Sequence, residues 1–448
     1  EYKSKILEAI STKQKLLDKL SNSLYNLKPD FNELAQNKSS LDKNEEIFYW
    51  SANVLADFLK NSRQAILKHV YRVASKAEEI DTTKDTAPKA IDDENQFISF
   101  DIARSIFSEI LNRQKRRNSK PLNNKEAAWI INSSYRKARR QSMTPVGVVG
   151  EYDIMIQTKA ILGDDYEEAR DAPCLQNAIV NSLIEKLPKG GEWVKINIGK
   201  QNNSEEESLE HELELPALVY SFENINNTNI SIVLGASLDN VYIKDNSIYY
   251  ISNTKLDAKS KFLSNSLLNP LLSLIMYVTA LEEGNDESSY IITIKTVSKD
   301  EKKEPLDFKI SLTKKEATDY INLLVSEMVN PDSIKQNYQY HSLCDSISKT
   351  VFDSKGFINP DLNKEIKLTL VGHDLVEKII DYKPNERDEY KLNISSPPYC
   401  EGAIKELFPE AREVDDALVA QFISILKTRY FVPIMLPLKE AEHKTSEN

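Results

Sequence analysis

The sequence predicts a fold with both helices and strands, in the α/β (α+β) class. A long helix is expected to cover one face of its central sheet. Segments near residues 193, 217, 232, 241, 249 and 292 alternate between polar and apolar residues or are rich in β-branched residues, as strands are. After the segment near 249, apolar residues recur at helical spacing from about Lys259 to Glu282. We therefore expect these strands to form one mixed sheet with this helix packed on one face.

Helices are expected before this strand-rich centre. The sequence predicts a helix over residues 2–27, a helix pair from Phe48 to Ala74 broken at Asn61-Ser62, two helices between Phe100 and Arg140, and one over 175–187. Residues 199–214 are acidic and rich in asparagine, which predicts a surface hairpin or loop. Pro216 makes Leu215–Phe222 an expected edge strand.

The second half of the chain begins with a strand pair and then turns helical. Tyr290–Val297 alternates and Phe308–Leu312 is its expected partner. Thr313 and Glu316 have the spacing of a capping box, which predicts a helix that ends near Val329. Further helices are expected over 333–352, 361–382 and 413–430, with Pro433 as a break.

We interpret the chain as a tail followed by one large domain. Residues 1–46 are expected to be the helical tail of a preceding domain plus a linker, and residues 47–448 the main domain with a helical, basic insertion at about 97–145. The chain has neither an initiating methionine nor a signal-peptide pattern, so we expect it to be part of a longer protein.

Composition excludes several classes of protein. Three widely separated cysteines, Cys174, Cys344 and Cys400, suggest neither a disulfide framework nor a zinc site, which fits a cytoplasmic protein. No P-loop, GxGxxG, GxSxG or HExxH sequence is present, so nucleotide hydrolysis and common hydrolase mechanisms are not indicated. No cofactor or bound metal is expected.

The stretch from Ser231 to Glu283 has the layout of a metal-dependent nuclease core. An apolar strand precedes Gly235 and Asp239, a hairpin follows, and the next strand ends in Asn253-Thr254-Lys255 before the long helix. In such a core two carboxylates hold magnesium and the lysine orients water, but here the second carboxylate position is Asn253, whose neutral amide is a poor ligand for a hard cation. We expect Asp239, Asn253 and Lys255 to be a vestigial site without catalysis.

Two other interpretations of these residues remain open. Gly235, Asp239 and Lys255 are ordinary turn and surface residues in one of them. In the other, the protein is an active magnesium nuclease whose site combines Asp239 and Lys255 with a further carboxylate such as Asp257.

A strongly basic segment lies within the expected insertion. It has a net charge of +9, from Arg113, Lys115, Arg116, Arg117, Lys120, Lys125, Arg136, Lys137, Arg139 and Arg140 against Glu126 alone. In a chain with a net charge of −11, this concentration is the electrostatic footprint of a phosphate-binding surface. A charge run without interleaved aromatic residues is instead typical of a solvated helical face or a surface for an acidic protein, and this alternative stays open.

Several separated segments resemble the C-terminal part of RecC, the gamma subunit of exodeoxyribonuclease V. Asn53–Leu67 is similar to the family's L-x-x-F-L-x-x-P-x-x-x-F helix, with Ser62 in place of proline and Ile66 in place of an aromatic residue. The other similar segments follow in the family's order: Ile91–Phe100, Met143–Glu151, Lys255–Leu263, Phe308–Ala317 and Tyr430–Met435.

This resemblance implies a restriction-endonuclease-like core, of the PD-(D/E)XK type, with a degenerate active site and large helical insertions. It also implies partners, namely RecB-like and RecD-like subunits and double- and single-stranded DNA. The implied function is that of a non-catalytic DNA-channel and scaffold module in a helicase/nuclease that repairs double-strand breaks by homologous recombination and degrades linear DNA. A pure protein-interaction subunit is the remaining alternative, and salt-dependent DNA binding would separate the two.

Overall fold

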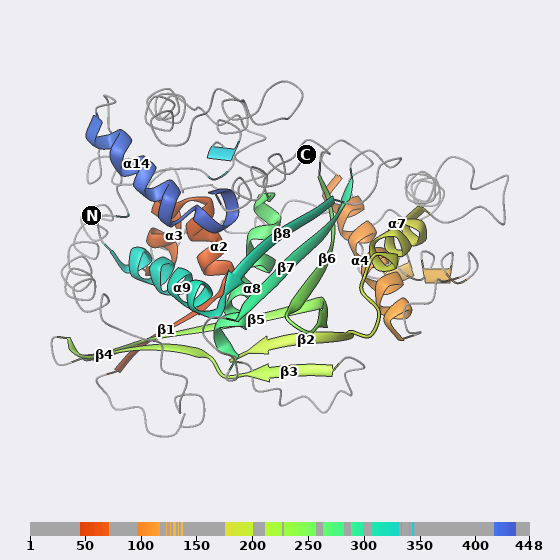
Figure 1. Ribbon diagram of the computed structural model, residues 1–448, viewed down its shortest axis with the longest axis horizontal. Helices are drawn as coiled ribbons and strands as arrows, with labels where there is room; N and C mark the ends of the chain where they lie inside the picture. The colour runs from red at the N-terminus through yellow and green to blue at the C-terminus, as the bar shows by residue number, and fades with distance from the viewer. Residues whose placement is uncertain are drawn as a thin grey trace, which may run out of the picture.

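The computed structural model describes part of the chain, and this part forms a mixed α/β fold (Figure 1). The described residues are 45–70, 96–116, 122, 126, 129–130, 133, 136–137, 175–199, 211–225, 228–256, 263–281, 288–298, 306–330, 333, 340, 343–344 and 416–435. Within these ranges no helix has both the length and the apolar character needed to cross a membrane.

The described residues include one eight-stranded sheet of mixed direction. Its strands are β1 (Glu45–Ser51), β2 (Glu192–Ile198), β3 (His211–Leu215), β4 (Leu218–Ile225), β5 (Thr228–Lys244), β6 (Ser247–Leu256), β7 (Ser289–Ser298) and β8 (Leu306–Thr313). The main path has the order β3-β2-β5-β6-β7-β8, and β1 and β4 pair with β5 outside this path.

β5 is the central strand, and it has different neighbours along its two halves. Its first half pairs in parallel with β1 and antiparallel with β4, whereas its second half pairs antiparallel with β2 and β6. The neighbours change at Gly235, where an added Cβ would lie 3.0 Å from the carbonyl oxygen of Ile198. Glycine therefore permits a close approach of two strands here, and the strand continues through it.

A helical crossover joins β6 to β7. The β5–β6 hairpin turns at Asp245, whose φ of 51° lies in the left-handed region that aspartate tolerates. β6 and β7 are parallel, so the connection between them must cross over, and it contains the short 3₁₀ turn Asn265–Leu267 and the helix α8 (Leu268–Ala280). α8 is buried along almost its whole length, which makes it a core helix.

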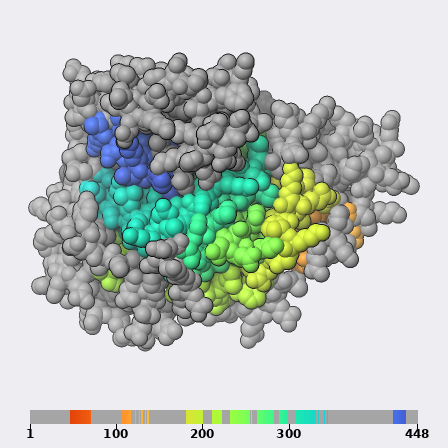
Figure 2. All heavy atoms as spheres, in the orientation of Figure 1, coloured from red at the N-terminus to blue at the C-terminus, as the bar shows by residue number. Residues whose placement is uncertain are grey.

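Helices cover both faces of the sheet. The helical segments on the α8 side are α2 (Ala52–Lys60), α3 (Ser62–Ala65), the π-helical turn η1 (Ile66–Val70), α9 (Lys314–Val329), α14 (Asp416–Thr428) and the π-helical turn η6 (Phe431–Met435). In the space-filling view α14 lies against the β8–α9 segment (Figure 2). A second apolar cluster joins α4 (Gln96–Arg116) and α7 (Leu175–Glu185) to Ile251 of β6 and Val297 of β7.

Most of the expected elements that fall on described residues are confirmed. The six predicted strand segments belong to one mixed sheet, and the predicted long helix packs on one of its faces, although it begins at Leu268 and not near Lys259. β8 pairs with β7, and the capping box of Thr313 and Glu316 starts α9. The predicted helix break is also confirmed, because the side chain of Asn61 accepts a hydrogen bond from the backbone of Gln64 and caps α3.

Two predicted elements were wrong. The expected helix start at Phe48 is instead part of β1, which pairs with a segment nearly two hundred residues later in the chain. Residues 211–214, expected in a surface hairpin or loop, belong to the edge strand β3, which pairs in parallel with β2 and therefore forms no hairpin with it. Of the expected tail and linker over 1–46, Glu45 and Glu46 belong to β1 and the rest lies outside the described residues, as do most of the helices expected over 333–382.

Candidate functional site

A β-bulge at Asp239 and Asn240 interrupts the pairing of β5 with β2. Val194 pairs with Val241 and Ile196 pairs with Leu238, so two residues of β5 lie opposite the single residue Lys195. Asn240 has a φ of 65°, a left-handed conformation for which asparagine is one of the more tolerant residues. Asp239 is exposed, and the bulge therefore lies at the residue that the sequence predicts to be the first carboxylate of the nuclease layout.

Lys115 from α4 reaches this bulge. Its Nζ donates a hydrogen bond to Oδ1 of Asn240 at 2.7 Å and lies 5.0 Å from the ring centre of Trp193. Only 8% of Lys115 is exposed, so its charge points into the molecule. The expectation that Lys115 is an exposed phosphate contact therefore needs correction, because this ammonium group is buried and already has partners within the protein.

Asn253 lies on β6, the neighbour of β5. The β5–β6 ladder ends at the pair Val241 and Tyr250, and both Asp239 and Asn253 lie just beyond it. Asn253 is half-buried, and the backbone of Lys255 pairs with Val297. The side chain of Lys255 and all of Asp257 lie outside the described residues. Among the side chains that the structure describes, no three His, Cys, Asp or Glu residues come close enough to hold a metal ion.

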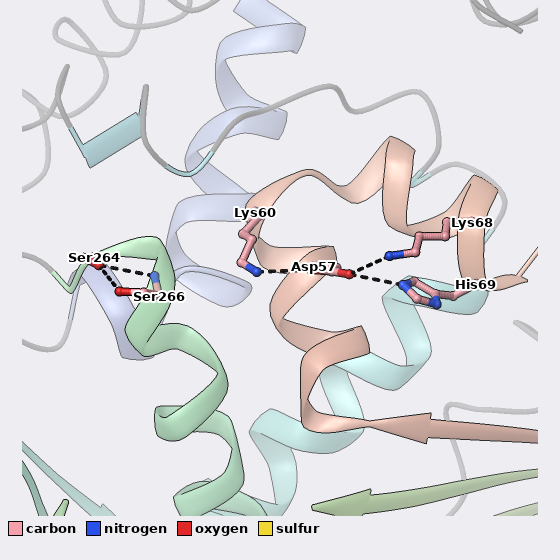
Figure 3. A network of polar contacts seen from close by, with 6 residues as sticks. All are labelled: Asp57, Lys60, Lys68, His69, Ser264 and Ser266. Atoms are coloured by element: carbon pink, nitrogen blue, oxygen red, sulfur yellow. Dashed lines mark hydrogen bonds and ion pairs between the residues drawn. The ribbon is translucent and has the colours of Figure 1, made fainter. Parts of the chain in front are cut away.

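Hydroxyl groups join the end of β6 to the start of α8. Ser252 Oγ donates to Thr254 Oγ1 at 2.9 Å, and Thr254 Oγ1 lies 3.5 Å from Ser266 Oγ. Ser264 caps the turn before α8 by accepting the backbone N–H of Ser266 at 3.2 Å (Figure 3). These bonds are made among the hydroxyls and backbone of the junction itself, so we assign the cluster a structural role.

A second polar network surrounds Asp57 on α2. Its carboxylate lies 3.1 Å from Lys60 Nζ, 3.4 Å from Lys68 Nζ and 3.3 Å from His69 Nε2 (Figure 3). Burial alone raises the pKa of the Asp57 carboxyl, but the hydrogen bond with His69 and the charges of Lys60 and Lys68 outweigh it and hold this pKa well below its usual value. The network connects α2 to η1 and was not anticipated from the sequence.

The surface of the basic insertion contains an exposed tryptophan. Trp129 is 58% exposed, and the guanidinium carbon of Arg113 lies 4.5 Å from its ring centre. The Nε of Arg113 also donates to Oε1 of Glu109 at 3.0 Å. Arg113 thus has two partners within the protein, Glu109 and the indole of Trp129, and its predicted contact with DNA stays a prediction. Trp129 lies between the two groups of basic residues, so inspection for aromatic residues within the run would have found it.

Three of the predicted DNA-binding residues are described and exposed. They form the group that we call the basic cluster: Arg116, Arg136 and Lys137. Arg116 follows Arg113 by one helical turn on α4, and Trp129, Arg136 and Lys137 are each helical residues with exposed side chains. The contact of Arg113 with Trp129 joins α4 to Trp129. Arg117, Arg139 and Arg140 lie outside the described residues, and their predicted role stays a prediction.

Comparison with known proteins adds no assignment. The sequence matches no model of a known protein family, and a search of curated proteins found no match.

Proposed function

We propose that this chain is a non-catalytic, DNA-binding scaffold module that works with the helicase and nuclease subunits of a RecBCD-type complex. The observations that carry the proposal are the exposure of Arg116, Arg136 and Lys137 and of Trp129, all within the basic insertion of a chain of net charge −11, and the contact of Arg113 with the Trp129 ring. Lysine and arginine at such a surface bind nucleic acid by neutralising phosphates and releasing counterions, without reading the sequence of bases.

The strands against which α4 packs support the proposal of a nuclease-like framework. A hairpin of β5 and β6 bears Asp239 on one strand and Asn253 on the other, and a buried helix then crosses to the parallel strand β7. This is the element order that the sequence layout of a metal-dependent nuclease predicts. With an amide at the second carboxylate position, Asp239 would be the one carboxylate of that layout, and one carboxylate holds magnesium poorly.

The position of α4 supports a binding role for the insertion. Lys115 at its last turn is hydrogen-bonded to Asn240, and Gln114 Nε2 donates to Oδ1 of Asn181 on α7 at 2.7 Å. These bonds and the apolar cluster beneath α4 fix the helix to the sheet. A helix fixed in this way presents Arg116 at a defined position, which reduces the entropy lost when a phosphate binds.

The partners and pathway in this proposal come from the resemblance to RecC. They are RecB-like and RecD-like subunits, double- and single-stranded DNA, and the repair of double-strand breaks with degradation of linear DNA. A module of this kind would guide strands past its partners, and the partners would supply helicase and nuclease chemistry.

The salt dependence of DNA binding tests the proposal. Replacing Arg116, Arg136 and Lys137 by alanine should reduce the slope of log K against log salt by about 0.9 for each phosphate that the protein no longer neutralises. The matched control replaces Lys189, Lys309 and Lys315, which are also exposed but lie elsewhere, and so changes the net charge equally. An unchanged slope in the first variant, or an equal change in the control, would contradict the proposal.

A further inference from the structure

Trp129 is much more exposed than the other two tryptophans of the chain. Of the chain's three tryptophans, Trp50 is 5% exposed and Trp193 is half-buried beside Tyr242, whereas Trp129 is 58% exposed. A buried indole contributes strongly to stability, and tryptophan is enriched at binding interfaces, so the exposed indole of Trp129 is a candidate binding contact.

The indole is held by a rigid part of the structure. The neighbouring residue Ile130 is 0% exposed, and so are Ile106, Ile110 and Leu111 on α4. Arg113 covers one side of the ring, and its own orientation is fixed by Glu109. Arg113 lies against the ring as a planar cation, and 58% of the residue is still exposed, so the indole has surface left for a second planar group.

We propose that Trp129 is a stacking platform for unpaired DNA bases, with the basic cluster holding the adjoining phosphates. This inference rests on the proposed function and specifies its substrate as single-stranded DNA. The bases of a duplex are stacked on one another inside the helix, so an exposed indole gains little from them. Unpaired bases stack on aromatic side chains whatever their identity, while cations follow the backbone.

The test uses the full chain and three DNA probes of equal length: an oligothymidine, an abasic strand with the same phosphates, and a duplex. Trp129→Ala should weaken binding of oligothymidine about tenfold, which is the effect of losing one stacked base. Binding of the abasic strand and of the duplex should stay unchanged. Trp129→Phe should restore most of the affinity, and an unchanged unfolding midpoint in both variants should show that folding is intact.

Tryptophan fluorescence gives a second test of the stacking platform. Oligothymidine should quench the fluorescence of the wild-type chain, and Trp129→Phe should abolish most of that quenching, because the other two tryptophans are buried or half-buried. The abasic strand should cause little quenching in either protein. Equal quenching by the two strands would overturn the stacking platform.

The remaining outcomes separate this inference from the proposed function. If duplex and abasic strand bind with a steep salt dependence but Trp129→Ala leaves oligothymidine binding unchanged, the stacking platform is wrong and phosphate binding stands. If no probe binds even at low salt, both are wrong. If polyglutamate binds and Trp129→Ala weakens that binding as much as it weakens binding of oligothymidine, the surface serves an acidic protein and the platform is again overturned.

Discussion

Arg429 donates a hydrogen bond from its Nε to Oε2 of Glu327 at 2.6 Å. Arg429 is 0% exposed, and its guanidinium carbon also lies 4.5 Å from the ring centre of Phe58. The next residue, Tyr430, donates its hydroxyl to the carbonyl oxygen of Leu59 at 2.9 Å. The C-terminal segment is thereby fixed to α9 and to α2, a helix near the opposite end of the sequence.

This contact predicts a large loss of stability on removal of one partner. Glu327→Gln keeps the size of the side chain but removes the negative charge that the buried Arg429 Nε contacts, which should lower the free energy of unfolding by about 3 kcal/mol. Asp319→Asn on the exposed side of the same helix is the control and should change it by less than about 0.5 kcal/mol. Urea unfolding measures both, and equal effects of the two substitutions would contradict the role given to Glu327.

Lys115 and Arg116 are adjacent residues for which we predict opposite effects. Lys115→Met removes a buried hydrogen bond to Asn240 and should lower the free energy of unfolding by about 1 kcal/mol without altering the salt slope of DNA binding. Arg116→Met should leave stability nearly unchanged and reduce the slope by about 0.9 for duplex DNA and about 0.7 for single-stranded DNA. DNA-binding titrations at several salt concentrations measure the slope for both variants, and thermal unfolding measures their stability. A change of slope for Lys115→Met would show that this lysine reaches phosphate after all.

The Asp57 network predicts an acid dependence of stability. The folded pKa of Asp57 is lowered, so its contribution is present above the ordinary carboxyl pKa of about 4 and is lost as the pH falls from there toward the folded value. The stability difference between the wild-type chain and Asp57→Asn should therefore shrink as the pH is lowered from about 5 to about 3. Urea unfolding at each pH measures it. A difference that stays constant or grows toward acid would contradict the assignment.

The proposal that Asp239, Asn253 and Lys255 are a vestigial nuclease site predicts that the chain alone does not cut DNA. With the carboxylate of Asp239 and the neutral amide of Asn253 as the two ligands of the proposed layout, the magnesium needed to activate water would be poorly held. The chain incubated with linear DNA and magnesium or manganese should leave the DNA intact on a gel. Degradation that disappears in Asp239→Ala would instead establish an active nuclease.

The elements that could be predicted are those with a recognisable pattern in their own stretch of sequence. Alternation identified β2 and β7, and the capping box identified the start of α9 from Thr313 and Glu316 alone. β1 was missed because Phe48 and Trp50 run directly into a helical pattern and gain their strand conformation by pairing with a distant part of β5. β3 was missed because a polar edge strand looks like an acidic loop in sequence.

The candidate site was predictable in its components but not in their arrangement. The sequence identified Asp239 and the basic run, and the exposed positions of Arg116, Arg136 and Lys137 fit a phosphate-binding surface. The inward orientation of Lys115 depends on a contact with Asn240, which is 125 residues away in the chain, and no local pattern encodes it. Trp129 could have been noticed from sequence, but its exposure could not.

Photo-crosslinking tests the central claim most directly, namely that the surface around Trp129 and the basic cluster contacts DNA. Single-stranded DNA containing 5-iodouracil is irradiated with the full chain, and the modified residues are located by mass spectrometry. We predict modification of Trp129, reduced when Arg116, Arg136 and Lys137 are replaced by alanine. Crosslinks confined to aromatic residues elsewhere, such as Tyr49, which is 67% exposed on β1, would contradict the account.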